Sequence, residues 1–334
     1  MIGDRLWLDN PPPARMTLAD WQTRLEKTFN REGVIGGTSL LPVLAAEREY
    51  GAKADALLRG FLVLSESFQN FLFDTIRLAE HTARGGNHPT TDEWFGVLLM
   101  EFASLFRAFR AADTLYHSGY PLDGFSLLRD VRDRAIFIGG IGSRLTTLRA
   151  LFGYQEGAHV PEKLTEEMWA QMHRRAEAVE RDLIRKTIGA ESGLGTAAID
   201  ELKGWTELFH LEVHGSRLTR ATEFRDWITG KFQLPLVPEP RTQALAVFVN
   251  RFVEVGWMIL RVLPLLQLAP NTFESDWEKR WNILDDSFRH DAEGLWRMGK
   301  PIEGAIIHMI DVKFAFSPKD AYSRRCGGEL AERG

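Results

Sequence analysis

Two histidines and a glutamate near residue 210 have the residue types and the spacing of a metal site. His210 and His214 are four residues apart and Glu207 lies one turn earlier, so on a helix the three side chains share a face. Imidazole and carboxylate groups are good ligands for transition metals. The order differs from the H-E-x-x-H of zinc peptidases, because Glu212 lies midway between the histidines. The alternatives are therefore a metal-dependent hydrolase or oxygenase and, more commonly, histidines that are hydrogen-bonded inside a helical bundle.

An arginine and a histidine earlier in the chain have the types needed for phosphodiester chemistry. Six residues separate Arg110 from His117, and Asp113 lies between them on nearly the same helical face. This spacing resembles the long end of the R-x4-6-H pattern of HEPN ribonucleases. There the histidine handles a proton of the ribose 2'-hydroxyl and the arginine stabilises phosphate charge. The alternative is the polar stripe of an ordinary amphipathic helix, because phenylalanine and leucine occupy the opposite side.

A third charged cluster lies in a segment that is otherwise rich in Phe, Leu and Ile. Arg129 precedes Asp133 by four residues and Asp130 precedes Arg134 by four, so each pair can meet on a helix surface. The planar guanidinium of an arginine in a partly dry site fits a carboxylate or a phosphate. Arg129 is therefore a candidate site residue, and the more common interpretation is a structural network of ion pairs.

Other functional motifs are missing from the sequence. It contains no P-loop, no dinucleotide-binding fingerprint after a strand and no nucleophile elbow, and we predict no cofactor. The formal charge of -5, from 41 basic and 46 acidic residues, provides no general basic field, so RNA stays an option that net charge does not indicate. The ten tryptophans are interpreted mainly as core or interface anchors.

The elements that position these side chains are predicted to be helices. Leucine outnumbers valine and isoleucine together, most prolines fall between segments with a three-to-four-residue apolar period, and no alternating strand pattern is evident. We predict an all-α fold, an irregular bundle of about ten helices without a significant sheet. The expected helices cover residues 17–33, 52–84, 91–119, 121–140, a segment from 165, 196–215, 217–232, 241–268, 273–298 and 301–315.

We expect one helical domain over residues 17–318. An extended segment, 1–16, precedes it, and a weakly ordered tail, 319–334, follows it. The Pro-rich segment 234–240 is a long connection or an internal boundary. The most apolar stretch, 244–269, contains charged residues and a proline that a membrane helix tolerates poorly, so we predict a buried core helix and no membrane partner.

The expected compartment is the cytoplasm. The N-terminus lacks the cationic start and apolar run of a secretory signal. The single cysteine, Cys326, excludes an intramolecular disulfide and fits a reducing environment.

Two short segments resemble a family of uncharacterised bacterial all-helical proteins. The matching residues are Ala112, Leu115, Gly119, Leu128 and Arg129, and then Val213, His214 and Gly215. The resemblance implies a bacterial intracellular helical protein in which Arg129 and His214 converge. Some proteins of this kind are distantly similar to the HEPN superfamily, which includes toxin and phage-defence ribonucleases.

Because no catalytic signature is decisive, our first prediction is a binding or interaction protein that acts as a homo-oligomer or with a protein partner. Its aromatic and Met side chains would serve as interface anchors. The alternatives are a HEPN-type, metal-independent ribonuclease using Arg110 and His117, or Arg129 and His214, and a metal-dependent enzyme using His210 and His214.

Overall fold

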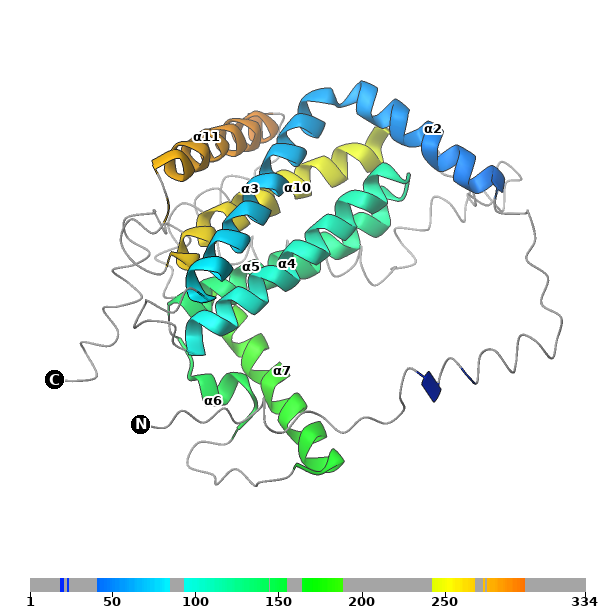
Figure 1. Ribbon diagram of the computed structural model, residues 1–334. Helices are drawn as coiled ribbons and strands as arrows, with labels where there is room; N and C mark the ends of the chain where they lie inside the picture. The colour runs from blue at the N-terminus through cyan, green and yellow to red at the C-terminus, as the bar shows by residue number, and fades with distance from the viewer. Residues whose placement is uncertain are drawn as a thin grey trace. The chain divides into compact units, whose positions relative to one another are not determined.

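The residues that the structure describes are almost entirely helical (Figure 1). The computed structural model describes residues 19, 20, 23, 41–84, 93–143, 145–154, 164–188, 242–267, 273 and 275–297. No strand occurs among these residues, which confirms the predicted all-α class. Several predicted segments lie outside the described residues: the helices 196–215, 217–232 and 301–315, and the segments 1–16, 234–240 and 319–334. Of the predicted helix 17–33, the structure describes three residues.

The described helices fall into two compact units. They are α2 (Leu41–Leu57), α3 (Arg59–Arg84), α4 (Glu93–His117), α5 (Pro121–Gly142), α6 (Leu148–Leu151), α7 (Glu166–Ile188), α10 (Thr242–Val262), the 3-10 helix η3 (Leu263–Leu266) and α11 (Ser275–Arg297). One unit contains α6 and residues 166–182 of α7. The other contains α2 from residue 43, α3 to α5, α10, η3 and α11.

In the smaller unit, a capped turn precedes the contact between α6 and α7. The Thr147 hydroxyl accepts a hydrogen bond from the Ala150 amide and caps α6. Gly153 follows with φ of 72°, and the carbonyl of Met172 fills the place that a Cβ would take. Glycine is therefore required here both for its left-handed backbone and for the close approach of α7.

Prolines and a glycine mark helix boundaries in the larger unit. Pro121 is the first residue of α5, and Gly119, with φ of 91°, makes the turn between α4 and α5. Pro264 lies in η3, after α10 has ended at Val262, so the predicted helix 241–268 stops at this proline, earlier than expected.

The prediction of one helix over 52–84 is wrong. The chain forms α2 and α3, which run in different directions and join at Leu58 (Figure 1). Backbone hydrogen bonds still link Leu58 to Ala54 and Leu62 to Leu58, so the join is a bend rather than a loop. Phe68, Phe71 and Leu72 of α3 are buried in the bundle core, whereas Tyr50 and Ala54 of α2 are buried near the C-terminal end of α4.

The core of the larger unit is rich in aromatic rings. Helix α4 packs along α5, α5 along α10 and α10 along α11, and α3 contacts α4. The Phe252 ring lies 4.8 Å from Phe61 and 4.5 Å from Phe109, and Tyr116 stacks on Phe248 at 4.7 Å between centroids. Such pairs contribute about 1 kcal/mol each beyond the burial of their area. The aromatic side of α4 therefore packs against α10, and the opposite, polar side of α4 faces away from this core.

Three tryptophans act as core anchors, as predicted. The Nε1 of Trp257 donates to Asp285 at 2.8 Å, that of Trp277 to the Thr75 hydroxyl at 2.7 Å and that of Trp281 to the Leu260 carbonyl at 2.9 Å. These bonds join α11 to α10 and α3.

The apolar segment 244–269 forms α10 and η3, and every described residue from 252 to 260 is buried. This confirms the prediction of a core helix. Within the described part of the chain, no helix has the length and apolar composition needed to cross a membrane.

Candidate functional site

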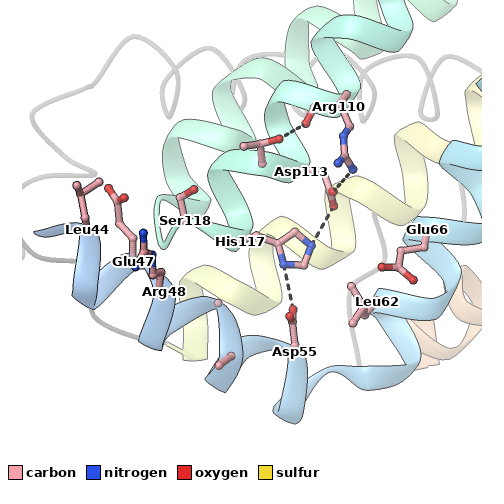
Figure 2. A pocket seen from close by; sticks show the side chains of 13 residues that line it. Leu44, Glu47, Arg48, Asp55, Leu62, Glu66, Arg110, Asp113, His117 and Ser118 are labelled. Carbon is pink, nitrogen blue, oxygen red and sulfur yellow. Dashed lines mark hydrogen bonds and ion pairs between the residues drawn. The ribbon is translucent and has the colours of Figure 1, made fainter.

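A pocket of about 660 Å³ lies between α2 and the helices α3 and α4 (Figure 2). Small-molecule sites commonly have volumes of about 300–1,000 Å³. The lining comprises Leu44, Glu47, Arg48, Gly51, Ala52 and Asp55 from α2, Leu62 and Glu66 from α3, and Arg110, Asp113, Thr114, His117 and Ser118 from α4 and the turn that follows it. Two of the sequence candidates, Arg110 and His117, therefore line the same pocket.

The helical period of α4 places these side chains. Arg110, Asp113 and His117 recur at steps of three and four residues and so lie on one face. The neighbouring Phe109 and Tyr116 are fully buried in the aromatic core. Because the core fixes the rotation of α4, its polar stripe faces α2 and α3.

Asp113 is the centre of a buried polar network. Its side chain is 4% exposed, and Oδ1 accepts a hydrogen bond of 2.9 Å from the Ser65 hydroxyl of α3. The Ser65 oxygen in turn accepts a bond of 2.8 Å from Gln69 Nε2. Burial acts to raise the pKa of Asp113, but the hydrogen bond and charge of His117, with the polar groups of Gln69 and Ser65, outweigh it and lower the pKa. Asp113 is thus held as a carboxylate inside the fold.

Arg110 reaches the same network from the solvent side. Its Nη1 donates to Gln69 Oε1 at 3.0 Å and lies 3.5 Å from Asp113 Oδ2. The side chain is 59% exposed, so its charge is largely screened by water. The guanidinium is therefore held by protein contacts on one side and open to the pocket.

His117 lies between two carboxylates from different helices. Its Nδ1 is 3.0 Å from Asp55 Oδ1 of α2, and its Nε2 is 3.6 Å from Asp113 Oδ1 (Figure 2). The hydrogen bond to Asp113 is the largest contribution that raises the pKa of His117. Burial opposes it, and the charges of Asp113 and Asp55 add to it. Both contacts are ion-pair distances, and Asp55 Oδ1 has no hydrogen-bond partner among the described residues, so the two carboxylates favour the protonated imidazole through their charge.

Helix α2 makes a second polar contact near the pocket. The hydroxyl of Tyr120, which precedes α5, donates to Glu47 Oε1 at 2.8 Å. That contact is the main cause that raises the pKa of Tyr120. Gly51 lies against the carbonyl of His117, where an added Cβ would be 2.9 Å from the oxygen. Helix α2 therefore approaches the end of α4 closely enough for its side chains to close the pocket.

The geometry limits the chemistry available here. A protonated imidazole lacks the lone pair needed for a general base or a metal ligand, although it can donate a proton. The Ser65 hydroxyl donates to Asp113 and is not paired with the histidine, so no Ser–His–Asp arrangement forms from these residues. Among the described residues, no group of three His, Cys, Asp or Glu side chains fits a metal ion.

Arg129 lies outside this pocket. Its Nε is 3.9 Å from Asp133 Oδ2 within α5, which is the contact expected from the four-residue spacing. The prediction that Asp130 pairs with Arg134 is wrong. Arg134 Nη1 instead bonds Glu101 Oε2 of α4 at 3.0 Å, because the packing of α5 on α4 brings that carboxylate closer.

The remaining candidates, Glu207, His210 and His214, lie outside the described residues. The metal site and the convergence of Arg129 with His214 therefore stay predictions.

The sequence interpretation missed the contributions of α2 and α3. Ser65 and Gln69 are polar residues four apart on the buried face of α3, and such a pair in an apolar stripe is a signal of a buried hydrogen-bond partner. Asp55 has no comparable signal, because its role depends on the bend at Leu58.

Comparisons with protein-family models, with curated protein sequences and with solved structures give no significant match for this chain.

Proposed function

We propose that this chain acts by binding rather than by catalysis, and that its ligand is a small polar molecule held in the pocket between α2, α3 and α4. The observation that carries the proposal is the position of His117 between the carboxylates of Asp55 and Asp113. It lies 3.0 Å and 3.6 Å from two carboxylates that raise its pKa, so it is placed to hold charge and position rather than to remove a proton. The pocket volume of about 660 Å³ suits a small ligand.

The charges of the lining favour a ligand with groups of both signs. Arg48 and Glu66 both line the pocket and are exposed, and Figure 2 shows them on opposite sides of His117. An anionic group can bind near Arg48, and a cationic group near Glu66. Zwitterionic amino acids and dipeptides are the probes that match this pattern.

A thermal-shift panel of amino acids and dipeptides at millimolar concentration tests the proposal. A ligand that binds only the folded state at a hundred times its Kd stabilises it by about 2.7 kcal/mol, which raises Tm measurably. We expect Arg48→Gln and Glu66→Gln to abolish the shift. Glu80→Gln, which changes an acid of α3 outside the pocket, is expected to keep it. A panel without a shift, or a shift that survives both pocket variants, rejects this assignment.

We further propose that the protein works in the bacterial cytoplasm as a homo-oligomer or with a protein partner. Supporting this are large apolar side chains exposed on the described surface: Leu44, Val63, Phe73, Met100 and Ile283. Size-exclusion chromatography with light scattering tests the association. A clean monomer without a co-purifying partner argues against it.

A HEPN-type ribonuclease, in a toxin or phage-defence role, is the second candidate. It is favoured by one observation: Arg110 and His117 both reach the Asp113 carboxylate and face the same pocket. A protonated His117 could protonate a leaving oxygen while the guanidinium of Arg110 stabilises phosphate charge. The carboxylates of the pocket oppose an RNA backbone, which is why this function ranks second.

Incubation of the purified protein with mixed RNA distinguishes the two functions. Cleavage that His117→Ala and Arg110→Ala abolish would establish the ribonuclease. The absence of cleavage at any protein concentration rejects it.

A further inference from the structure

Helix α2 contributes six of the residues that line the pocket, and among the described residues two side-chain polar contacts attach it to the rest of the bundle. Asp55 pairs with His117 at one end of the helix, and Glu47 accepts from Tyr120 nearer the other. We propose that α2 is a lid, closed by the imidazolium of His117 that Asp55 of α2 and Asp113 of α4 share, and opened when that imidazolium loses its proton. This inference concerns the regulation of the pocket and rests on the proposed function for its purpose, whereas the movement of α2 can be measured without a ligand.

The hydrogen-bonding capacity of histidine is the first step of the argument. An imidazolium donates from both ring nitrogens, and a neutral imidazole donates from only one. After deprotonation, one of the two carboxylates therefore faces a lone pair. Asp113 is 4% exposed and keeps its bond from Ser65, whereas the Asp55 side chain is 40% exposed and its buried Oδ1 meets His117 as an ion pair without a hydrogen-bond partner among the described residues. Asp55, with α2, is thus the partner that is released.

The charges around His117 reinforce the release. The charged and titratable groups that line the pocket around it are Glu47, Arg48 and Asp55 from α2, Glu66 from α3, and Arg110 and Asp113 from α4; Tyr120 lies next to Glu47. Four carboxylates face two guanidinium groups. When His117 is protonated, its charge offsets the repulsion between Asp55 and Asp113, and when it is neutral that repulsion favours separation of α2 from α4.

The buried face of α2 contains a polar group that opening would satisfy. Tyr50 is 2% exposed, and its hydroxyl has no hydrogen-bond partner among the described residues. The hydroxyl of Tyr116 on α4 also has no hydrogen-bond partner among the described residues. Burial is the main cause that raises the pKa of both tyrosines. Opening gives these hydroxyls water as a partner, which reduces the cost of moving the lid.

The sign of the pH effect follows from the histidine. Its pKa is raised in the closed state, so protonation favours closure at pH values below the ordinary pKa of histidine. As the pH rises through the raised pKa, the closed state loses this advantage. A single linked proton changes the open-to-closed ratio by at most tenfold per pH unit.

Distance measurement by spin labelling tests the lid. Labels are placed at the exposed positions Ala45→Cys on α2 and Arg107→Cys on α4, in a Cys326→Ser background. Distance distributions are recorded at pH 6 and pH 9. We expect a single short distance at pH 6 and a growing long-distance population at pH 9.

Variants test whether the proton of His117 controls the movement of α2. Asp55→Asn and, separately, His117→Gln should show the open distribution at both pH values. Glu49→Gln, which removes a carboxylate of α2 that pairs only with Lys53 of the same helix, should keep the response of the parent protein. If His117→Gln fails to fold, the partly exposed Asp55 still provides the test.

Two results would overturn the proposal: a folded parent protein whose distances do not change with pH, or a pH response that persists in Asp55→Asn. A ligand panel that fails while the lid moves would reject the proposed function alone.

Discussion

Asp113→Asn is the substitution that tests the polar network most directly. It replaces a buried carboxylate with a neutral amide of nearly the same shape. Breaking a buried ion pair by neutralising one partner costs about 3–5 kcal/mol. Asp113 is 4% exposed, but its partners Arg110 and His117 are 59% and 26% exposed. Water can therefore replace part of the interaction that these two side chains lose with the carboxylate. We therefore expect the free energy of unfolding to fall by about 3 kcal/mol, the lower end of that range.

The effect should depend on pH. The pKa of Asp113 is lowered in the fold, so its contribution is present above the ordinary pKa of an aspartate and is lost as pH falls through the lowered value. The pKa of His117 is raised, so its contribution is present below the ordinary pKa of a histidine and is lost as pH rises through the raised value. Both contributions coexist in mildly acidic solution, and the loss caused by Asp113→Asn should be larger at pH 6 than at pH 9.

Urea unfolding followed by far-UV circular dichroism at pH 6 and pH 9 measures both quantities. Asp74→Asn is the matched control, because Asp74 is 57% exposed and pairs with Arg280 on the surface, where such a pair contributes about 1 kcal/mol or less. If Asp113→Asn loses no more than the control at pH 6, the carboxylate does not organise the site. An equal loss at both pH values would show that His117 is not coupled to it.

Three further substitutions and one matched control test the packing of the larger unit. Gly124→Ala should lower stability by about 1–3 kcal/mol in thermal unfolding, because the added Cβ would lie 2.7 Å from a backbone carbonyl of α4 and 2.9 Å from a ring of α10. The matched Gly96→Ala meets no atom within 4 Å and should stabilise α4 by about 0.5–1 kcal/mol, so equal effects of the two would contradict the packing. Tyr50→Phe should leave the urea midpoint unchanged or higher, since it removes a buried hydroxyl without a partner, and a clear loss would mean that the hydroxyl is bonded. Trp257→Phe should cost about 1–3 kcal/mol by guanidinium chloride unfolding, because Asp285 loses its indole donor in a buried position; an unchanged midpoint would refute that role.

The sequence by itself determined the class of fold and the ends of several helices. The apolar period of three to four residues, the proline that opens α5 and the proline that follows α10 act within a few residues of chain, so their consequences can be derived locally. The same local rule placed Arg110, Asp113 and His117 on one stripe of α4, which is the part of the candidate site that the sequence predicted.

Only the tertiary structure decided what that stripe faces. The bend at Leu58 turns α2 so that Asp55 meets His117, and the packing of α3 on α4 brings Ser65 to Asp113, 48 residues away in sequence. Packing likewise gave Arg134 a partner on α4 instead of the one that the helix spacing favoured. A helical period fixes which residues share a face. The direction of that face depends on how the buried rings of several helices fit together, and that fit is set by contacts distant in the chain.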